Sequence, residues 1–175
     1  SLSLGIVELR RQAEEIFDLM KRSGIAPELA YGITSAVPGV RESRRIICDK
    51  KVTDQDIYNG TQFDDGLFTV EHGVDIHKCT EDEPAIFLKK CVPYQIPFGA
   101  LLPKGLRNIM VIGRCIGGGH EALASYRLIA DCFAMGEAAA LAAKQALRTK
   151  RQLREIEVSG IFDEMTARGY HESSR

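Results

Sequence analysis

Several features that would assign a protein to a functional class are missing from these 175 residues. No run of about 18 or more apolar residues occurs, so the sequence predicts no membrane-spanning helix. The N-terminus lacks a signal-peptide pattern. The five cysteines include no C-x-x-C pair and are odd in number. This usage predicts neither a metal site nor a disulfide framework, and it favours a reducing, cytoplasmic environment.

A charge excess of either sign is also missing. The net charge is -1, and acidic and basic residues are interspersed along the chain. Such a distribution favours neither nucleic acid nor a membrane surface as a partner. With 45% hydrophobic and 27% charged residues, the composition is typical of a soluble globular protein. The length fits one domain, or one domain with part of another.

Two common phosphate-binding motifs do not fit the sequence. A P-loop needs Lys followed by Ser or Thr after its last glycine, and Gly118 is followed by Gly119 and His120. A G-x-G-x-x-G motif starting at Gly113 would need glycine at position 115, where Cys115 stands. The loop is therefore not expected to hold a nucleotide phosphate by itself.

The most informative stretch of the chain is 106–143. Its apolar run at 109–112 predicts a strand buried on both faces. The loop at 114–124, with three consecutive glycines, is followed by a predicted helix over 125–148. The first amides of a helix lack internal acceptors and lie at the positive end of its dipole, and glycines let a ligand approach the backbone. We therefore expect an anion at this junction.

Hydrophobic periodicity and turn residues predict the other elements. Helices are expected over 3–22, over a short stretch that Thr53 caps and Gly60 ends, and over 159–168. The acidic segment 78–84 is predicted to be a solvated loop. Strands are expected at 29–36, 43–51, 67–70, 74–77, 85–88 and 94–98. This set of short strands favours an antiparallel sheet with flanking helices, and hence an α+β fold.

The segment 113–143 reads GRCIGGGHEALASYRLIADCFAMGEAAALAA. It resembles the C-terminal flavin-binding segment of the FAD-dependent oxidoreductases, the glutathione-reductase-like flavoprotein class. Further pieces match one bacterial branch of that class in the same order, at 39–46, 53–57, 75–77, 94–98 and 102–104. The glycines at 117–119 depart from that branch, which has Ser and small polar residues there. Glu-Ala-Ala-Ala at 137–140 stands where the branch has Gln-Ala-Ala-Gly.

The resemblance implies an antiparallel, substrate-side α+β region over 1–104. The last strand and helix of an FAD/NAD(P)-binding-like α/β domain would lie at 105–150, followed by a C-terminal helix and tail at 151–175. Members of the class begin with a βαβ unit carrying G-x-G-x-x-G, which does not occur in this sequence. We therefore expect the C-terminal part of a longer flavoprotein, with weak or no FAD binding and no turnover by this chain alone.

The resemblance also implies positions for a cofactor site. A helix beginning near Ser125 would point its amides at the pyrimidine edge of the isoalloxazine, where flavin reduction places negative charge. Gly113 and Arg114 would lie beside the ribityl chain and the pyrophosphate. The cofactor-binding residues expected from the resemblance are Gly113, Arg114, Cys115, Ile116, Ser125, Tyr126 and Arg127.

Three residues are candidates for catalysis. His120 either moves protons near the flavin or only caps the helix start, and the residues do not decide between these roles. Arg41 and Arg44 would point to opposite faces of a strand, so one would anchor a substrate carboxylate and the other would form a structural ion pair.

The parent enzyme implied by the resemblance transfers hydride or electrons between FAD and a small organic substrate. A reading from a different class is a stand-alone, non-catalytic binding or scaffold module with a flavoprotein-like fold. In a third arrangement two chains complete one another in a homo-oligomer, which sequence does not test.

Overall fold

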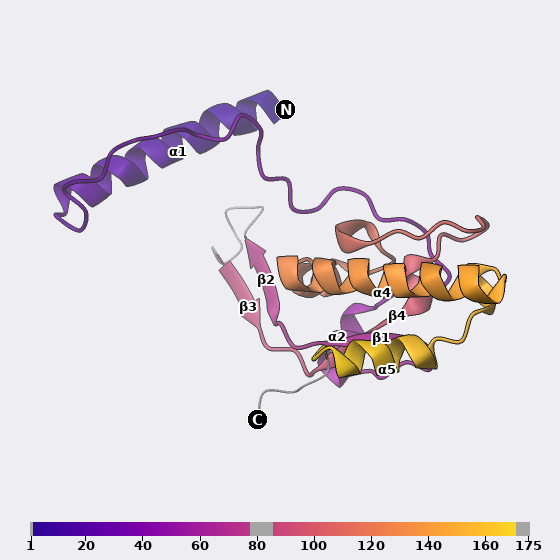
Figure 1. Cartoon of the computed structure of the whole chain (residues 1–175). Coiled ribbons are helices and arrows are strands. Elements are labelled where there is room, and N and C mark those ends of the chain that lie inside the picture. Colours follow the sequence, from indigo (N-terminus) through magenta and orange to yellow (C-terminus); the bar gives the residue numbers. More distant parts are fainter. Residues whose placement is uncertain (1, 78–85, 171–175) are drawn as a thin grey trace. The chain divides into compact units, whose positions relative to one another are not determined.

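The computed structural model describes residues 2–77 and 86–170 and divides into two compact units, Ser1–Ser43 and Arg44–Arg175 (Figure 1). Each unit is described by itself below. The domain boundaries predicted at 104/105 and 150/151 stay a prediction. No described helix combines the length and the apolarity that a membrane crossing requires.

The first unit consists of the helix α1 (Leu2–Arg22) and an irregular segment that follows it. The predicted amphipathic helix over 3–22 is confirmed. Arg11 forms ion pairs with Glu8 and Glu15, at three- and four-residue spacing on one helix face. Gly24, with φ +72°, lies just beyond the helix end, where the left-handed conformation suits glycine. No residue of α1 is buried within the described part of the chain.

The strand predicted at 29–36 is wrong. The segment is irregular, and its main anchor is Tyr31, whose ring meets Phe17 of α1 edge to face at 5.2 Å between centroids. A strand needs a hydrogen-bonding neighbour, and none of the described strands lies in this unit. The β-branched residues therefore did not suffice to form a strand there.

The second unit is α+β, with antiparallel strands as predicted. Strand β1 (Gly66–Val70) pairs with β4 (Tyr94–Pro97), and β2 (Val74–His77) pairs with β3 (Ile86–Lys89). The expected strands at 67–70, 74–77, 85–88 and 94–98 thus exist, with small shifts at their ends. The predicted loop at 78–84 lies outside the described residues.

The two ladders form an interrupted hairpin instead of one continuous sheet. Val70 pairs with Tyr94 and Val74 pairs with Lys89, so residues 71–73 lie opposite 90–93 without pairing. Residues from outside the hairpin form hydrogen bonds with these unpaired residues. The amide of Val92 donates to the carbonyl of Ile57 at 3.0 Å, and the Ser125 hydroxyl donates to the carbonyl of His72. The break therefore brings His72 against the helix that carries Ser125.

A short helix begins as its sequence predicts. In α2 (Asp54–Asn59), the Thr53 hydroxyl accepts from the amide of Asp56 at 3.2 Å, while the Asp56 carboxylate accepts from the amide of Thr53 at 2.7 Å. This reciprocal capping box satisfies two amides at once. Gly60 ends the helix in the left-handed conformation, with φ +65°.

The core of the second unit lies between β1 and the long helices. Both α4 (Ile129–Thr149) and α5 (Ser159–Ala167) pack on β1, and they also contact one another, as the orange and yellow ribbons show (Figure 1). The predicted helix over 159–168 is confirmed. Fully buried side chains in this core include Phe68, Ile96, Met135, Ile161 and Met165.

Two further predicted strands, 43–51 and 109–112, are absent. Residues 46–52 form only isolated bridges, Cys48 with Pro103 and Val52 with Gly118. The apolar run 109–112 is not buried on both faces, because Ile109 and Ile112 are each more than 40% exposed. A central strand needs a strand on each side. The described residues supply none to this segment.

The predicted helix over 125–148 is two helices in the structure. Helix α3 (His120–Tyr126) ends at Arg127, and α4 begins after Leu128. The helix start predicted at Ser125 is therefore wrong, and the segment offers two helix starts in place of one.

Candidate functional site

The triple glycine at 117–119 is buried against the chain itself. A Cβ atom added to Gly117 would lie 2.4 Å from the carbonyl oxygen of Lys50. One added to Gly118 would lie 2.0 Å from the Tyr126 hydroxyl. All three glycines are buried. The expectation that they leave room for a ligand is therefore wrong, because the protein's own atoms occupy the space that the missing side chains leave.

The glycine loop contacts residues 46–52 through backbone hydrogen bonds. The amide of Val52 donates to the carbonyl of Gly117 at 3.0 Å, and the amide of Gly119 donates to the carbonyl of Val52 at 2.8 Å. The amide of Ile46 donates to the carbonyl of Cys115 at 2.9 Å. The glycine loop thus packs tightly against residues 46–52, and this packing positions the start of α3.

The carboxylate of Asp54 lies at the start of α3. Oδ1 of Asp54 accepts a hydrogen bond from the amide of Ala122 at 3.0 Å, and a Cβ on Gly119 would collide with the same oxygen. Arg45 donates to the carbonyl of Gly119 at 2.6 Å. A carboxylate at this position satisfies a helix amide and suits the positive end of the dipole. The α3 start is therefore capped by Asp54.

The start of α4 is different. Its N-cap is Leu128, whose side chain makes no capping hydrogen bond. Ile129, the first helical residue, is 76% exposed. A 21-residue helix carries a full dipole, so its first turn is a positive end, and residues 128–130 there are exposed. The sequence reasoning missed this start, for which the acidic Asp131 in the first turn was the available signal.

The turn 113–115, a short 3-10 helix, lies beside the first turns of α4. The amide of Gly113 is 3.2 Å from Sδ of Met135. A Cβ on Gly113 would lie 3.6 Å from Sγ of Cys132, and the positive φ of +74° suits glycine there. Arg114 is exposed, and its charge acts on the thiol of Cys132. The structure thus brings Gly113 and Arg114 to the α4 start.

The other predicted residues are placed as follows. The side chains of Ile116, Ser125 and Tyr126 are fully buried. Arg127, between α3 and α4, donates to the carbonyl of Asp75. His120 is the exposed first residue of α3. A role for any of these residues in binding or catalysis stays a prediction.

Arg41 and Arg44 are both exposed. Arg41 belongs to the first unit and Arg44 is the first residue of the second. Their expected roles in anchoring a substrate stay a prediction as well.

The thiol of Cys132, in the first turns of α4, is not activated. Burial raises the pKa of the Cys132 thiol, the neighbouring Asp131 carboxylate adds to this effect, and Arg114 opposes it. Burial likewise raises the pKa of Cys48. Cys48, Cys91, Cys115 and Cys132 form no disulfides. In the described ranges, no three His, Cys, Asp or Glu side chains gather as metal ligands would.

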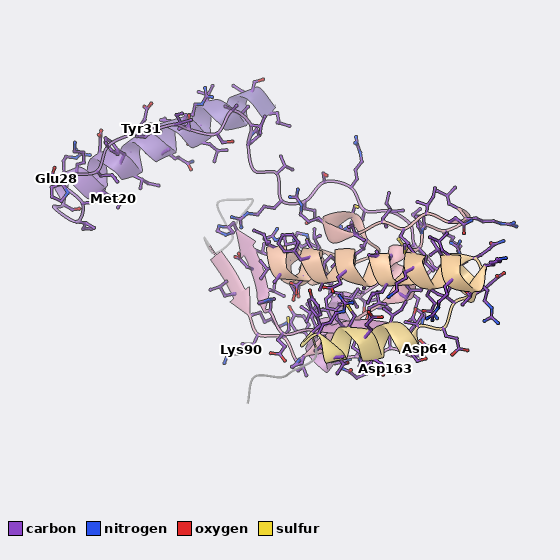
Figure 2. The ribbon with its side chains drawn as sticks, in the orientation of Figure 1. Met20, Glu28, Tyr31, Asp64, Lys90 and Asp163 are labelled. Atoms are coloured by element: carbon purple, nitrogen blue, oxygen red, sulfur yellow. The ribbon has the colours of Figure 1, made fainter. Side chains whose placement is uncertain are left out.

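Two shallow pockets lie elsewhere in the units. One, of about 230 Å³, is lined within the first unit by α1 and residues 34–39. The other, of about 240 Å³, lies within the second unit between residues 63–66 and α5, where Figure 2 shows Asp64 and Asp163 near one another. Neither pocket is lined by residues 113–115 or 128–131.

A stripe of apolar or small residues follows the outer face of α4. Its members recur at alternating four- and three-residue spacing, which places them on one helix face. The large ones are strongly exposed: Ile129 by 76%, Phe133 by 72% and Leu147 by 81%. Ile112 continues the stripe, since its Cδ1 would lie 3.8 Å from a Cβ on Gly136. We call this surface the α4 stripe; it consists of Ile129, Phe133, Gly136, Ala140, Ala143 and Leu147.

Comparison with known proteins identifies the family to which the chain belongs. The family model described as FAD dependent oxidoreductase matches residues 2–165. The chain therefore belongs to the FAD-dependent oxidoreductase family. No curated protein and no solved structure matches it.

The residues at the α4 start fit the polar parts of a flavin. The first amides of α4 would complement the electron-rich C2 carbonyl and N1 of the ring, and the exposed guanidinium of Arg114 would complement a phosphate. Gly113 leaves its Cβ position free of close contacts except the Cys132 sulfur at 3.6 Å. One buried oxygen of Asp131, in the first turn, lacks a hydrogen-bond partner among the described residues.

Proposed function

We propose that this chain is the C-terminal portion of a glutathione-reductase-like flavoprotein that transfers hydride or electrons between FAD and a small organic substrate. In this proposal the start of α4 faces the pyrimidine edge of the isoalloxazine, and Gly113 and Arg114 face the ribityl and pyrophosphate groups. A dinucleotide-binding βαβ unit of the parent protein packs on the α4 stripe and pairs with residues 109–112. The family match gives no support to a stand-alone scaffold.

The observation that carries the proposal is the α4 stripe. Isolated apolar residues are common on protein surfaces, but a helix with apolar faces on both sides is typical of one buried between two layers. The inner face of α4 already packs in the core through Ala134, Met135, Ala138 and Ala142. Burial of Ile129, Phe133 and Leu147 would contribute about 1.5–3 kcal/mol each. A second layer on this face would provide that stabilisation.

The adjoining segment 109–112 supports the same arrangement. Its sequence, Ile-Met-Val-Ile, is that of a buried parallel strand, yet two of its four side chains are exposed. One edge is already held, because the amide of Val111 donates to the carbonyl of Leu101 at 2.8 Å. A strand of the parent's nucleotide-binding sheet would complete the pairing and bury both exposed isoleucines.

FAD in this site would supply the two-electron chemistry, and the chain's residues would tune and position it. The first amides of α4 would stabilise the negative charge that reduction places on the pyrimidine edge. Arg114 would offset phosphate charge by a charge-assisted hydrogen bond. The side chains of Leu128 and Ile129, both exposed in this structure, would shield the ring from water.

The test compares this chain with its full-length parent protein. We expect FAD in about one-to-one stoichiometry in the parent, read from flavin absorbance, and little or none in this chain. Arg114→Ala in the parent should weaken FAD binding by on the order of 10–100-fold. Arg148→Ala, an exposed arginine at the far end of α4, is the matched control and should leave it unchanged.

A second variant tests the buried face. Gly136→Leu should leave the helix content of this chain unchanged, because the new Cβ would lie 3.8 Å from Ile112 Cδ1, an ordinary contact, on the outer face of α4. In the parent the same leucine would wedge into the layer on the α4 stripe and lower FAD retention. Stoichiometric FAD in this chain alone, or a parent sequence without a G-x-G-x-x-G unit, would disprove the proposal.

A further inference from the structure

A carboxylate lies buried at the start of α4. Asp131 is 5% exposed, and it is the third residue of the helix. Among the described residues, none donates a hydrogen bond to its Oδ2. A buried carboxylate without donors is costly, since water would otherwise solvate both oxygens. Such a group at a candidate ligand site calls for a reason other than packing.

His72 is the nearest basic group. Its Nε2 lies 4.0 Å from Oδ1 of Asp131, and the histidine side chain is 47% exposed. The break in the hairpin fixes its position, because the carbonyl of His72 accepts a hydrogen bond from the Ser125 hydroxyl. Thus one end of the pair is buried and the other reaches solvent beside the α4 start.

Other titratable groups face Asp131 from each packed element. Tyr94 of β4 donates its hydroxyl to Ser125 at 2.9 Å, and the Asp131 charge helps to raise the pKa of that tyrosine, although burial is the larger cause. Cys132 follows on α4, and Arg114 acts on it from the turn 113–115. His72 is the basic group whose electrostatic influence reaches the Asp131 carboxyl itself. Burial raises the pKa of the Asp131 carboxyl to about 6, and His72 opposes that shift.

We propose that His72 and Asp131 form the proton-exchanging pair of the site at the α4 start, with His72 meeting the substrate and Asp131 positioning the imidazole and stabilising its charge. The inference rests on the proposed function, because it places flavin and substrate beside this helix start. It deepens that function by assigning a base, which the family match does not provide.

The chemistry of the pair specifies a class of substrate. When a carbon that bears an O–H or N–H group is oxidised by two electrons, its C–H bond breaks and the hydride goes to the flavin. The O–H or N–H bond breaks as the C=O or C=N bond forms, and that proton needs an acceptor. With the Nε2 proton of neutral His72 directed toward Asp131, the imidazole takes the substrate proton at Nδ1, and the resulting cation is paired with the Asp131 carboxylate. The substrate is thus an alcohol or an amine.

The first arm of the test uses this chain. The Asp131 carboxyl is titrated by ¹³C NMR in the wild type, in His72→Gln and in His77→Gln. Removing the imidazole should raise the Asp131 midpoint by on the order of one pH unit, because the opposing positive charge is lost. His77, which pairs with Asp75 at 3.3 Å, is the matched control and should leave the midpoint unchanged. An unchanged midpoint in His72→Gln overturns the pair.

The second arm uses the full-length flavin-loaded protein and needs no substrate. The flavin midpoint potential is measured against pH, and its slope gives the number of protons taken up per two electrons. Near pH 6 the wild type should take up more protons than Asp131→Asn or His72→Gln, by up to about one, because negative charge on the ring draws a proton onto the pair. His77→Gln should match the wild type.

The outcomes separate the two proposals. Equal slopes in the wild type and both pair variants of a flavin-loaded protein overturn the pair and leave the proposed function standing. A full-length protein that holds no FAD overturns the proposed function and the catalytic role of the pair together. The first arm then still reports whether His72 and Asp131 are coupled in the fold.

Discussion

The substitution Gly117→Ala tests whether the glycine loop packs tightly against residues 46–52. The new methyl group would lie 2.4 Å from the carbonyl oxygen of Lys50 and 3.0 Å from Cβ of Cys48. The first contact is with backbone, so no side-chain rotation relieves it. The loop would have to move away from the segment 46–52, although both stretches are held by backbone hydrogen bonds.

The expected cost follows from those contacts. Overpacking a buried position costs about 1–3 kcal/mol. Movement of the loop would also weaken the bonds from Val52 to Gly117 and from Gly117 to Ala100, both at 3.0 Å, each worth about 0.5–1.5 kcal/mol. The lower entropy of the unfolded alanine chain offsets about 0.4–1 kcal/mol. We therefore expect the free energy of unfolding to fall by about 2–4 kcal/mol.

Urea denaturation followed by far-UV circular dichroism measures this change, since the chain has no tryptophan for fluorescence. With a slope of about 1–3 kcal/mol per molar urea, the midpoint should fall by roughly 1–2 M. The control is Gly136→Ala, where the new Cβ meets only Ile112 Cδ1 at 3.8 Å. It should stabilise this chain by about 0.5–1 kcal/mol, because alanine is the better helix former. If Gly117→Ala unfolds within about 0.5 kcal/mol of the wild type, the steric reasoning is wrong.

Three further predictions concern stability. Because burial raises the pKa of the Asp131 carboxyl to about 6, the folded state binds its proton more tightly than the unfolded state between about pH 4 and 6. As the pH rises across that window, the free energy of unfolding should therefore fall by about 2–3 kcal/mol more in the wild type than in Asp131→Asn. Urea titrations at both ends of the window measure this difference. Asp54→Ala should cost about 0.5–2 kcal/mol by uncapping α3, and Asp54→Asn, which keeps the acceptor, should cost less; equal losses would contradict the capping role. Arg154→Lys should lower the free energy of unfolding by about 1–3 kcal/mol, because the Arg154 guanidinium donates hydrogen bonds to Asp49 and to two backbone carbonyls. Arg151→Lys is the control and should be nearly neutral in the same thermal or urea unfolding experiment, because the Arg151 guanidinium makes one long hydrogen bond of 3.4 Å.

Local signals predicted the elements that local interactions hold. The capping box at Thr53 and the stop at Gly60 lie within a few residues of the helix that they bound, and α2 forms there. The short strands that became β1 and β4 were predicted for a similar reason, because each has a partner within the chain. The α1 helix follows from its periodicity and its Arg11 ion pairs.

Elements that depend on distant partners were predicted poorly. Residues 109–112 read as a buried strand, but the described residues supply no neighbouring strand. The triple glycine read as a ligand loop, yet the groups that fill it come from 48–54 and from Tyr126. Nothing local to 117–119 identifies those groups.

The site shows the same division. The sequence alone determined that a glycine turn and an arginine precede a long helix, and the resemblance of this segment to flavoproteins agrees with the family match. Only the tertiary structure decided which helix start remains accessible, because Asp54 closes α3 from about 70 residues earlier in the chain. It also decided that His72 meets Asp131, which requires the interrupted hairpin to fold against α3 and α4. Composition and periodicity describe a residue's neighbours along the chain, whereas a binding site depends on neighbours in space.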